Sequence, residues 1–132
     1  MKIVSVALCL VLPYAIGFTY NVPPDKLRYW DNLIEQHKQE CMEENGIDPK
    51  VGQTFLLSQE IPDEENYRCY MKCLAKATGI YDTTNHVYLK ESTMTNLGIT
   101  EEIFYECFQR DGEDDCDKVH SSVECLMQKF IV

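Results

Sequence analysis

The sequence predicts an all-α fold of about six short helices that are cross-linked by three disulfides. Apolar residues recur at three- and four-residue intervals in successive segments, and Gly, Pro and Asp residues separate these segments. No stretch alternates between apolar and polar residues as a half-buried strand does, so no strands are expected. An even number of cysteines follows an N-terminal segment that is typical of secreted proteins.

This N-terminal segment is expected to be a signal peptide that spans residues 1–17. Lys2 gives it a positive start, Ile3–Leu12 is apolar, and Ala15 and Gly17 supply the small residues of a cleavage site. The apolar run is too short to cross a bilayer, and Pro13 interrupts it, so a membrane anchor is disfavoured. Residues 18–132 then form one domain, which is expected to be secreted and extracellular and not inserted into a membrane.

The cysteines indicate disulfides rather than a metal site. Seven are present, and Cys9 belongs to the signal segment. The zinc alternative is disfavoured because there is no Cys-x2-Cys pair and the three histidines do not have zinc-finger spacing. In an oxidising compartment the remaining six predict three disulfides. These six are Cys41, Cys69, Cys73, Cys107, Cys116 and Cys125.

In the first half of the domain, the sequence predicts three helices. The first begins at Pro23-Pro24-Asp25 and ends at Asn45-Gly46. Its inward face carries Leu27, Trp30, Ile34, His37 and Cys41, whereas Lys38 and Gln39 are expected to face water. Asp48-Pro49 begins a short second helix. The third helix runs from Asp63 to Gly79 and places Cys69 and Cys73 one turn apart on one face, so each is expected to pair with a different part of the chain.

In the second half of the domain, the sequence predicts a loop and three further helices. Residues 80–85 form the loop, and His86–Leu97 is a fourth helix that Gly98 ends. Thr100 caps a fifth helix with Ile103, Phe104, Cys107 and Phe108 on its apolar side. Asp114 or Asp115 caps a sixth, whose apolar side includes Val119, Val123, Leu126 and Met127.

The composition and motifs argue against several functional classes. There are 12 basic and 22 acidic residues, a formal net charge of −10, which disfavours nucleic acid or an anionic membrane as a partner. Neither a Gly-x-Ser-x-Gly nor a His-Glu-x-x-His motif occurs, and no histidine is followed by aspartate as a lipolytic enzyme would need. Residues 111–115 fail the calcium-loop pattern, which requires glycine and glutamate where Cys116 and Ser122 stand. We expect neither an enzyme nor a cofactor.

The cysteine spacing is Cys41-x27-Cys69-x3-Cys73-x33-Cys107-x8-Cys116-x8-Cys125. The x3 gap and the last x8 gap resemble those of the insect odorant-binding protein family, which includes the pheromone-binding proteins. The resemblance implies a helical frame around an apolar cavity, and pairs Cys41–Cys73, Cys69–Cys116 and Cys107–Cys125. Spacing alone leaves fifteen pairings of six cysteines. Helix geometry disfavours only those that contain Cys69–Cys73.

The resemblance also implies which residues would contact a ligand. By offset from the matching cysteines, the cavity wall would include Trp30, Ala75, Ile80, Val87, Phe104, Val119, Val123 and Leu126. Further candidates are Ile34 on the first helix, Tyr70 and Leu74 on the third, and Phe130 near the C-terminus. Some relatives have hydroxyl groups after the third cysteine, where this chain has Ala75 and Ile80. The residues that could make polar contacts with a ligand instead are Tyr70, Tyr81 and Tyr88. For each wall residue, plain core packing is the competing interpretation.

Two segments suggest devices for ligand release. The apolar end, Phe130-Ile131-Val132, is expected to fold over the mouth of the cavity, the alternative being a frayed helix end. His37 is expected on the inward face, where protonation near pH 5–6 would loosen the cavity. A histidine that is already hydrogen-bonded or partly exposed is the competing interpretation.

The function expected from these observations is that of a secreted carrier of small hydrophobic molecules. Its partner would be an odorant- or pheromone-like ligand, with a membrane receptor as a further candidate, and its state would be a monomer or weak homodimer. The alternatives are an interaction protein of gland or reproductive fluid with a collapsed core, and, more remotely, a small lipolytic enzyme.

Overall fold

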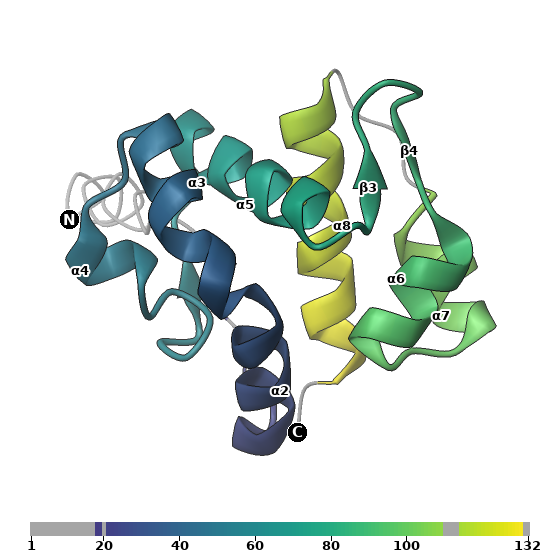
Figure 1. Ribbon diagram of the computed structural model, residues 1–132. Helices are drawn as coiled ribbons and strands as arrows, with labels where there is room; N and C mark the ends of the chain where they lie inside the picture. Colours follow the sequence, from purple (N-terminus) through teal and green to yellow (C-terminus); the bar gives the residue numbers. More distant parts are fainter. Residues whose placement is uncertain (1–17, 20, 110–113, 131–132) are drawn as a thin grey trace, which may run out of the picture.

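A computed structural model describes residues 18–19, 21–109 and 114–130 of the chain. Helices α5 (Glu65–Ala77) and α8 (Asp115–Lys129) pack against each other at the centre (Figure 1). The N-terminal helices lie on one side of this pair, and helices α6 (Lys90–Leu97) and α7 (Glu101–Cys107) lie on the other. The all-α prediction is confirmed: six helical units make up most of the described residues. The expected signal peptide, residues 1–17, lies outside them.

The first helical unit is divided by a tighter turn. It comprises α2 (Pro24–Ile34), the 3₁₀ turn η2 (Glu35–His37) and α3 (Lys38–Asn45), and it ends at Gly46, whose φ of 63° is left-handed. A 3₁₀ turn has three residues per turn instead of 3.6, so it changes which residues face inward. Lys38 is consequently 1% exposed, and His37 is half-buried. The expectation that Lys38 faces water was therefore wrong.

The buried ammonium group of Lys38 has three acceptors. Its Nζ lies 2.7 Å from Asp31 Oδ1, 2.6 Å from the carbonyl oxygen of Gln53, and 3.1 Å from Glu35 Oε1. Asp31 is itself buried, whereas the Glu35 side chain is mostly exposed. A buried charge needs such partners, because leaving water is costly without them. Lys38 thus fixes the 3₁₀ turn of the first helical unit to the chain at Gln53.

Short elements connect this unit to the central pair. Helix α4 (Pro49–Gly52) begins at Asp48, whose side chain accepts a hydrogen bond from the Lys50 amide, as the sequence predicts. Turns over residues 53–59 lead to β2 (Glu60–Ile61), which pairs antiparallel with β1 (Phe18–Thr19). No pattern in the sequence indicated this pair of two-residue strands, because each strand is too short to show alternation.

A small hairpin replaces part of the expected fourth helix. The strands β3 (Tyr81–Asp82) and β4 (Val87–Tyr88) pair antiparallel, and α6 spans only Lys90–Leu97. The prediction of a helix from His86 was wrong at its start, because His86 has a φ of 59° at the hairpin tip. Asp82 holds the turn by accepting hydrogen bonds from the amides of Thr84 and Asn85.

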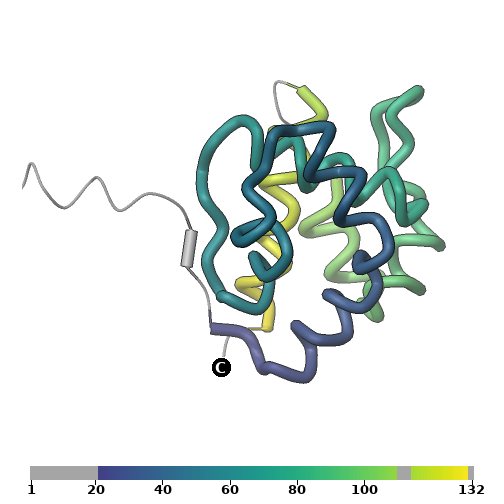
Figure 2. The backbone as a smooth tube through the Cα atoms, turned by 60° about the vertical axis from the view of Figure 1, so that its left-hand side comes forward, coloured from purple at the N-terminus to yellow at the C-terminus, as the bar shows by residue number. Residues whose placement is uncertain are grey.

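The last two helices follow the sequence prediction closely. Helix α7 (Glu101–Cys107) is capped by the Thr100 side chain, and α8 by the Asp114 side chain. In Figures 1 and 2 the end of α8 lies beside the beginning of α2. Contacts from Phe130 to Trp30 and Lys26 account for this arrangement.

The structure contains the three disulfides that the resemblance implies. Cys41–Cys73 joins α3 to α5, Cys69–Cys116 joins α5 to α8, and Cys107–Cys125 joins the end of α7 to α8. Helix α5 therefore holds two neighbours through cysteines one turn apart. Each bond contributes about 2–4 kcal/mol to the stability of a small domain.

Candidate ligand-binding site

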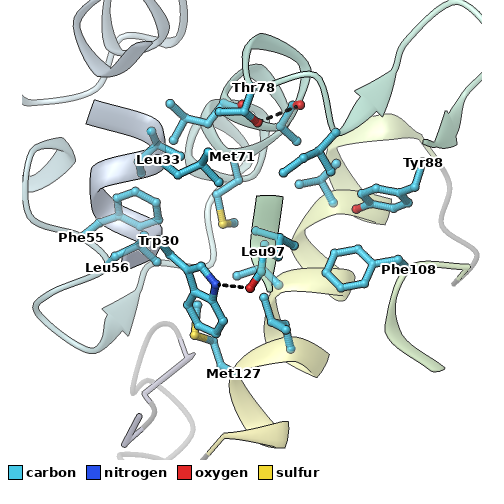
Figure 3. Close-up of a pocket in the computed structure, with 17 residues that line it drawn as sticks. Trp30, Leu33, Phe55, Leu56, Met71, Thr78, Tyr88, Leu97, Phe108 and Met127 are labelled. Carbon is cyan, nitrogen blue, oxygen red and sulfur yellow. Dashed lines mark hydrogen bonds between the residues drawn. The ribbon is translucent and has the colours of Figure 1, made fainter. Parts of the chain in front are cut away.

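An apolar cavity of about 90 Å³ lies between the central helices and the surrounding elements (Figure 3). Its wall takes residues from both halves of the chain: α2 and the turn 53–59 on one side, the hairpin and the end of α7 on the other, and α5 and α8 between them. None of the lining side chains carries a charge. They are Trp30, Leu33, Ile34, Phe55, Leu56, Met71, Leu74, Ala75, Thr78, Ile80, Tyr88, Leu97, Phe108, Val119, Val123, Leu126 and Met127.

Two polar side chains in the wall donate hydrogen bonds to backbone carbonyl oxygens. Trp30 Nε1 donates a hydrogen bond of 2.9 Å to the carbonyl oxygen of Leu97, which fixes α2 to the end of α6. The Thr78 hydroxyl donates 2.8 Å back to the carbonyl oxygen of Leu74, within its own helical turn. Both groups are engaged in holding the frame, and Figure 3 shows both bonds.

The structure brings most of the predicted wall residues together. Each comes from a helix face or turn that packs inward on the cavity, and their role in ligand binding remains a prediction. They are Trp30 and Ile34 of α2, Leu74 and Ala75 of α5, Ile80 after it, and Val119, Val123 and Leu126 of α8.

Four predicted residues do not line this cavity. The Tyr70 hydroxyl donates a hydrogen bond of 2.9 Å to the carbonyl oxygen of Gly52, and its ring packs against Phe55 in the core. Val87 is 49% exposed on strand β4 of the hairpin. Phe104 is buried on the far side of Phe108, where the rings stack at 6.2 Å. Cysteine offsets had placed Val87 and Phe104 in this wall, and Tyr70 was a further candidate on the third helix. None of the three lines this cavity, and their role in ligand binding remains a prediction.

The fourth, Phe130, packs behind the cavity wall. Its ring meets Trp30 edge-on at a centroid distance of 5.5 Å, and Lys26 Nζ lies 4.7 Å from its centroid. Phe130 therefore backs a wall residue without lining the cavity itself. Ile131 and Val132, the rest of the predicted tail, lie outside the described residues. His37 is also absent from the wall; its ring lies 3.4 Å from the exposed amide of Gln36.

Several lining residues were not identified as site residues from the sequence. Phe108 and Met127 belong to apolar helix faces that the sequence shows, so helical periodicity would have found them. Met71 lies one turn before Leu74 and gives the same signal. Phe55 and Leu56 come from irregular turns, where no periodicity points inward. Tyr88 was a candidate only for polar contact, and it lies in a strand where a helix was expected.

A second cavity of about 250 Å³ adjoins the first. It is lined by Tyr81, His86, Val87, Tyr88, Phe104, Phe108, Gln109 and Lys118, and so it is more polar than the first. Tyr88 and Phe108 line both cavities, and their rings meet edge-on at 5.0 Å. These two rings therefore form the partition between an apolar chamber and a more polar one.

Hydrogen bonds fix the hairpin to the first turn of α8. The Tyr81 hydroxyl donates 2.5 Å to Asp115 Oδ1, and His86 Nδ1 lies 2.9 Å from the same oxygen. Burial raises the pKa of Tyr81 above its usual range, and the bond to Asp115 adds to this rise. Burial also favours a higher pKa for Asp115, but hydrogen bonds from Tyr81 and His86 prevail and lower that pKa. Asp115 is thus held as a carboxylate, which anchors strand β3 and the tip of the hairpin.

Neither a metal centre nor a membrane span is found among the described residues. No three or more His, Cys, Asp and Glu side chains there are grouped so that they could hold an ion. None of their helices is long and apolar enough to cross a bilayer.

The comparison with known families agrees with this geometry. The sequence profile of the PBP/GOBP family matches residues 30–129, which include all six disulfide cysteines. No curated protein and no solved structure matches the chain. The family comprises insect odorant-binding carriers rather than enzymes. The profile covers well over half of the chain, and the all-α fold with three disulfides fits the six-cysteine type. The chain therefore belongs to the PBP/GOBP family, the insect odorant-binding proteins.

Proposed function

We propose that this protein is a secreted carrier that binds small hydrophobic molecules in its apolar cavity and transports them through aqueous fluid. The observation that carries the proposal is a cavity whose lining residues include none with a charge. Transfer of an apolar ligand from water into such a site is favourable at about 25 cal/mol for each Å² of apolar surface removed from water.

The disulfides support the same function. A void in a protein core costs stability, because the lining atoms lose contacts. The three cross-links join α3, α5, α7 and α8, so the frame around the cavity keeps its arrangement whether or not a ligand is bound. A carrier needs such a frame, since it must remain folded both empty and loaded.

The cavity must enlarge to take ligands of ordinary size. Sites for small molecules usually measure about 300–1,000 Å³, whereas this one measures about 90 Å³. Met71 and Met127 in its wall have unbranched side chains that adapt readily to different shapes. Movement of Phe108, which lines both cavities, would add the neighbouring chamber. We infer that ligands enter with rearrangement of these side chains.

The small volume is also the observation that favours the alternative function. A secreted interaction protein with the same scaffold would use its surface and would keep a nearly closed core. The two functions differ in one measurable property, which is binding of apolar molecules inside the fold. Signal-peptide cleavage, a receptor partner and a monomeric or weakly dimeric state fit both functions and do not separate them.

Binding of an apolar fluorophore, N-phenyl-1-naphthylamine, tests the proposal. Ala75 lines the cavity, so Ala75→Phe fills it, whereas Ala77 is exposed near the end of the same helix, so Ala77→Phe adds the same side chain outside. We expect saturable fluorophore binding by the unaltered protein and by Ala77→Phe. We expect at least tenfold weaker binding by Ala75→Phe.

Two results would overturn the proposal. One is the absence of saturable binding by the folded, fully oxidised protein to this fluorophore and to a series of C6–C12 alcohols. The other is equal binding by Ala75→Phe and the unaltered protein, since the fluorophore would then sit elsewhere. Thermal unfolding of each variant shows whether it is folded.

A further inference from the structure

The Tyr88 hydroxyl is a polar group in the cavity wall that has no hydrogen-bond partner. Trp30 and Thr78 also bring polar groups to the wall, and both donate to backbone carbonyls. The Tyr88 oxygen is fully shielded from water and makes no hydrogen bond. A shielded polar group without a partner is uncommon in folded proteins and calls for an explanation.

A second hydroxyl with the same property lies beside it. Ser122 is fully buried on α8, between the wall residues Val119 and Val123, and its Oγ makes no hydrogen bond. Burial raises the pKa of Tyr88, and the neighbouring Ser122 hydroxyl partly opposes this rise. The two oxygens are therefore close, but they do not meet at hydrogen-bonding geometry.

The ring of Tyr88 is held in a defined orientation by its neighbours. Tyr81 meets it edge-on at 4.9 Å from one side, and Phe108 does so at 5.0 Å from another. In Figure 3 the hydroxyl end of Tyr88 points toward the cavity. Phe55 and Leu56 lie across the cavity from it, and Trp30 lies with them. The site thus has one polar end and one apolar end.

We propose that the Tyr88 hydroxyl, assisted by the neighbouring Ser122 hydroxyl, forms a polar anchor that selects ligands with one uncharged oxygen-containing end, such as an alcohol, aldehyde or ketone, and an apolar body directed toward Trp30. This inference rests on the proposed carrier function. Tyr88 lines the cavity, whereas Ser122 lies next to it and does not itself line the cavity. A hydroxyl can both donate and accept, so the pair accommodates either an alcohol or a carbonyl group. A carboxylate does not fit, because no lining side chain is cationic and a desolvated anion without a counter-charge is unfavourable.

Paired ligands and paired variants test the anchor. Hexan-1-ol and 1-chlorohexane have the same carbon chain, but only the alcohol donates a hydrogen bond. Tyr88→Phe removes one oxygen and keeps the ring. Tyr29→Phe is the matched control, because Tyr29 is 47% exposed and does not line the cavity. The dissociation constant of each ligand is measured by displacement of N-phenyl-1-naphthylamine.

The preference is the ratio of the dissociation constant for 1-chlorohexane to that for hexan-1-ol. We expect this ratio to be about tenfold lower in Tyr88→Phe than in the unaltered protein and in Tyr29→Phe. The affinity for 1-chlorohexane should be nearly the same in all three. Ser122→Ala should reduce the preference by a smaller factor. Because the Tyr88 oxygen has no partner in the folded protein, Tyr88→Phe should melt at the same temperature as the unaltered protein or higher.

The outcomes separate the anchor from the carrier function. Equal preference in the unaltered protein and Tyr88→Phe overturns the anchor and leaves the carrier function standing, since both ligands still bind. A clearly lower melting temperature for Tyr88→Phe also overturns it, because the oxygen would then have a structural role. Absence of binding by every protein overturns the carrier function, and the anchor with it.

Discussion

Polar groups at the two ends of the cavity differ in whether they are hydrogen-bonded. At the α2 end, Trp30 Nε1 bonds to Leu97, and behind it the buried Lys38 bonds to Asp31 and to the backbone of Gln53. At the hairpin end, the hydroxyls of Tyr88 and Ser122 are shielded from water without a partner. Both ends are buried, so exposure to water does not explain the difference.

The difference separates structural polar groups from groups that are available to a ligand. A buried polar group that is fully bonded lowers the energy of one arrangement and holds it. A buried group without a partner costs free energy until something binds it. We therefore assign the α2 end to the frame and the hairpin end to ligand selection. The predictions below test this division.

Breaking the Lys38–Asp31 pair has the largest expected effect. Lys38→Met leaves Asp31 buried without its partner, and loss of one member of such a pair costs about 3–5 kcal/mol. The contact with Glu35 contributes little, because that side chain is 59% exposed. Urea unfolding of the single variant measures the loss.

The double variant Lys38→Met/Asp31→Leu is the control for that experiment. It removes both charges, so it should recover most of the lost stability. An equal loss in the single and double variants would contradict the account of Lys38 as a paired charge. Ligand affinity, measured where both variants are folded, should stay within a few-fold of that of the unaltered protein.

Removal of the Phe130 ring has an intermediate expected effect, on ligand release. Phe130→Ala deletes the edge-on contact that supports Trp30, and such contacts are worth about 0.5–1.5 kcal/mol. We expect the dissociation rate of N-phenyl-1-naphthylamine to rise about two- to tenfold in stopped-flow displacement. Leu57→Ala is a suitable control, since Leu57 is 43% exposed and does not line the cavity. An unchanged rate would show that Phe130 does not retain the ligand.

Acid should weaken the attachment of the hairpin, with the smallest effect. The lowered pKa of Asp115 means that its carboxylate favours the folded state above the usual carboxyl pKa of about 3.9, and that this contribution is lost as the pH falls below that value. Asp115→Asn should therefore cost about 0.5 kcal/mol at pH 7 and progressively less toward pH 3. Urea unfolding at both pH values measures this, and a cost independent of pH would contradict the assignment.

Regular patterns allowed much of the fold to be predicted. Helical periodicity located α5, α7 and α8, and the caps at Thr100 and Asp114 are where the sequence places them. Each of these features depends on neighbours within about four residues. For the same reason the wall residues Val119, Val123 and Leu126, one turn apart on α8, were accessible to prediction.

Features that depend on distant contacts could not be predicted. The 3₁₀ turn at Glu35–His37 brings Lys38 inward, where Asp31 and the backbone of Gln53 satisfy it, and no local pattern shows that partner. Each strand of the hairpin has only two residues, and the hairpin is held by hydrogen bonds to Asp115, which lies 29 residues beyond His86. Tyr88 therefore lines the cavity from a segment that was predicted to be a helix.

Methyl NMR of methionine tests the central claim most directly, because the described methionines fall into two pairs. Met71 and Met127 line the cavity, whereas Met42 and Met94 do not. With ¹³C-labelled methionine methyl groups and hexan-1-ol as titrant, we predict saturable shifts and ligand contacts at Met71 and Met127, with Met42 nearly unchanged. Shifts confined to Met42 and Met94, or no saturable shift at any methionine, would contradict binding in this cavity.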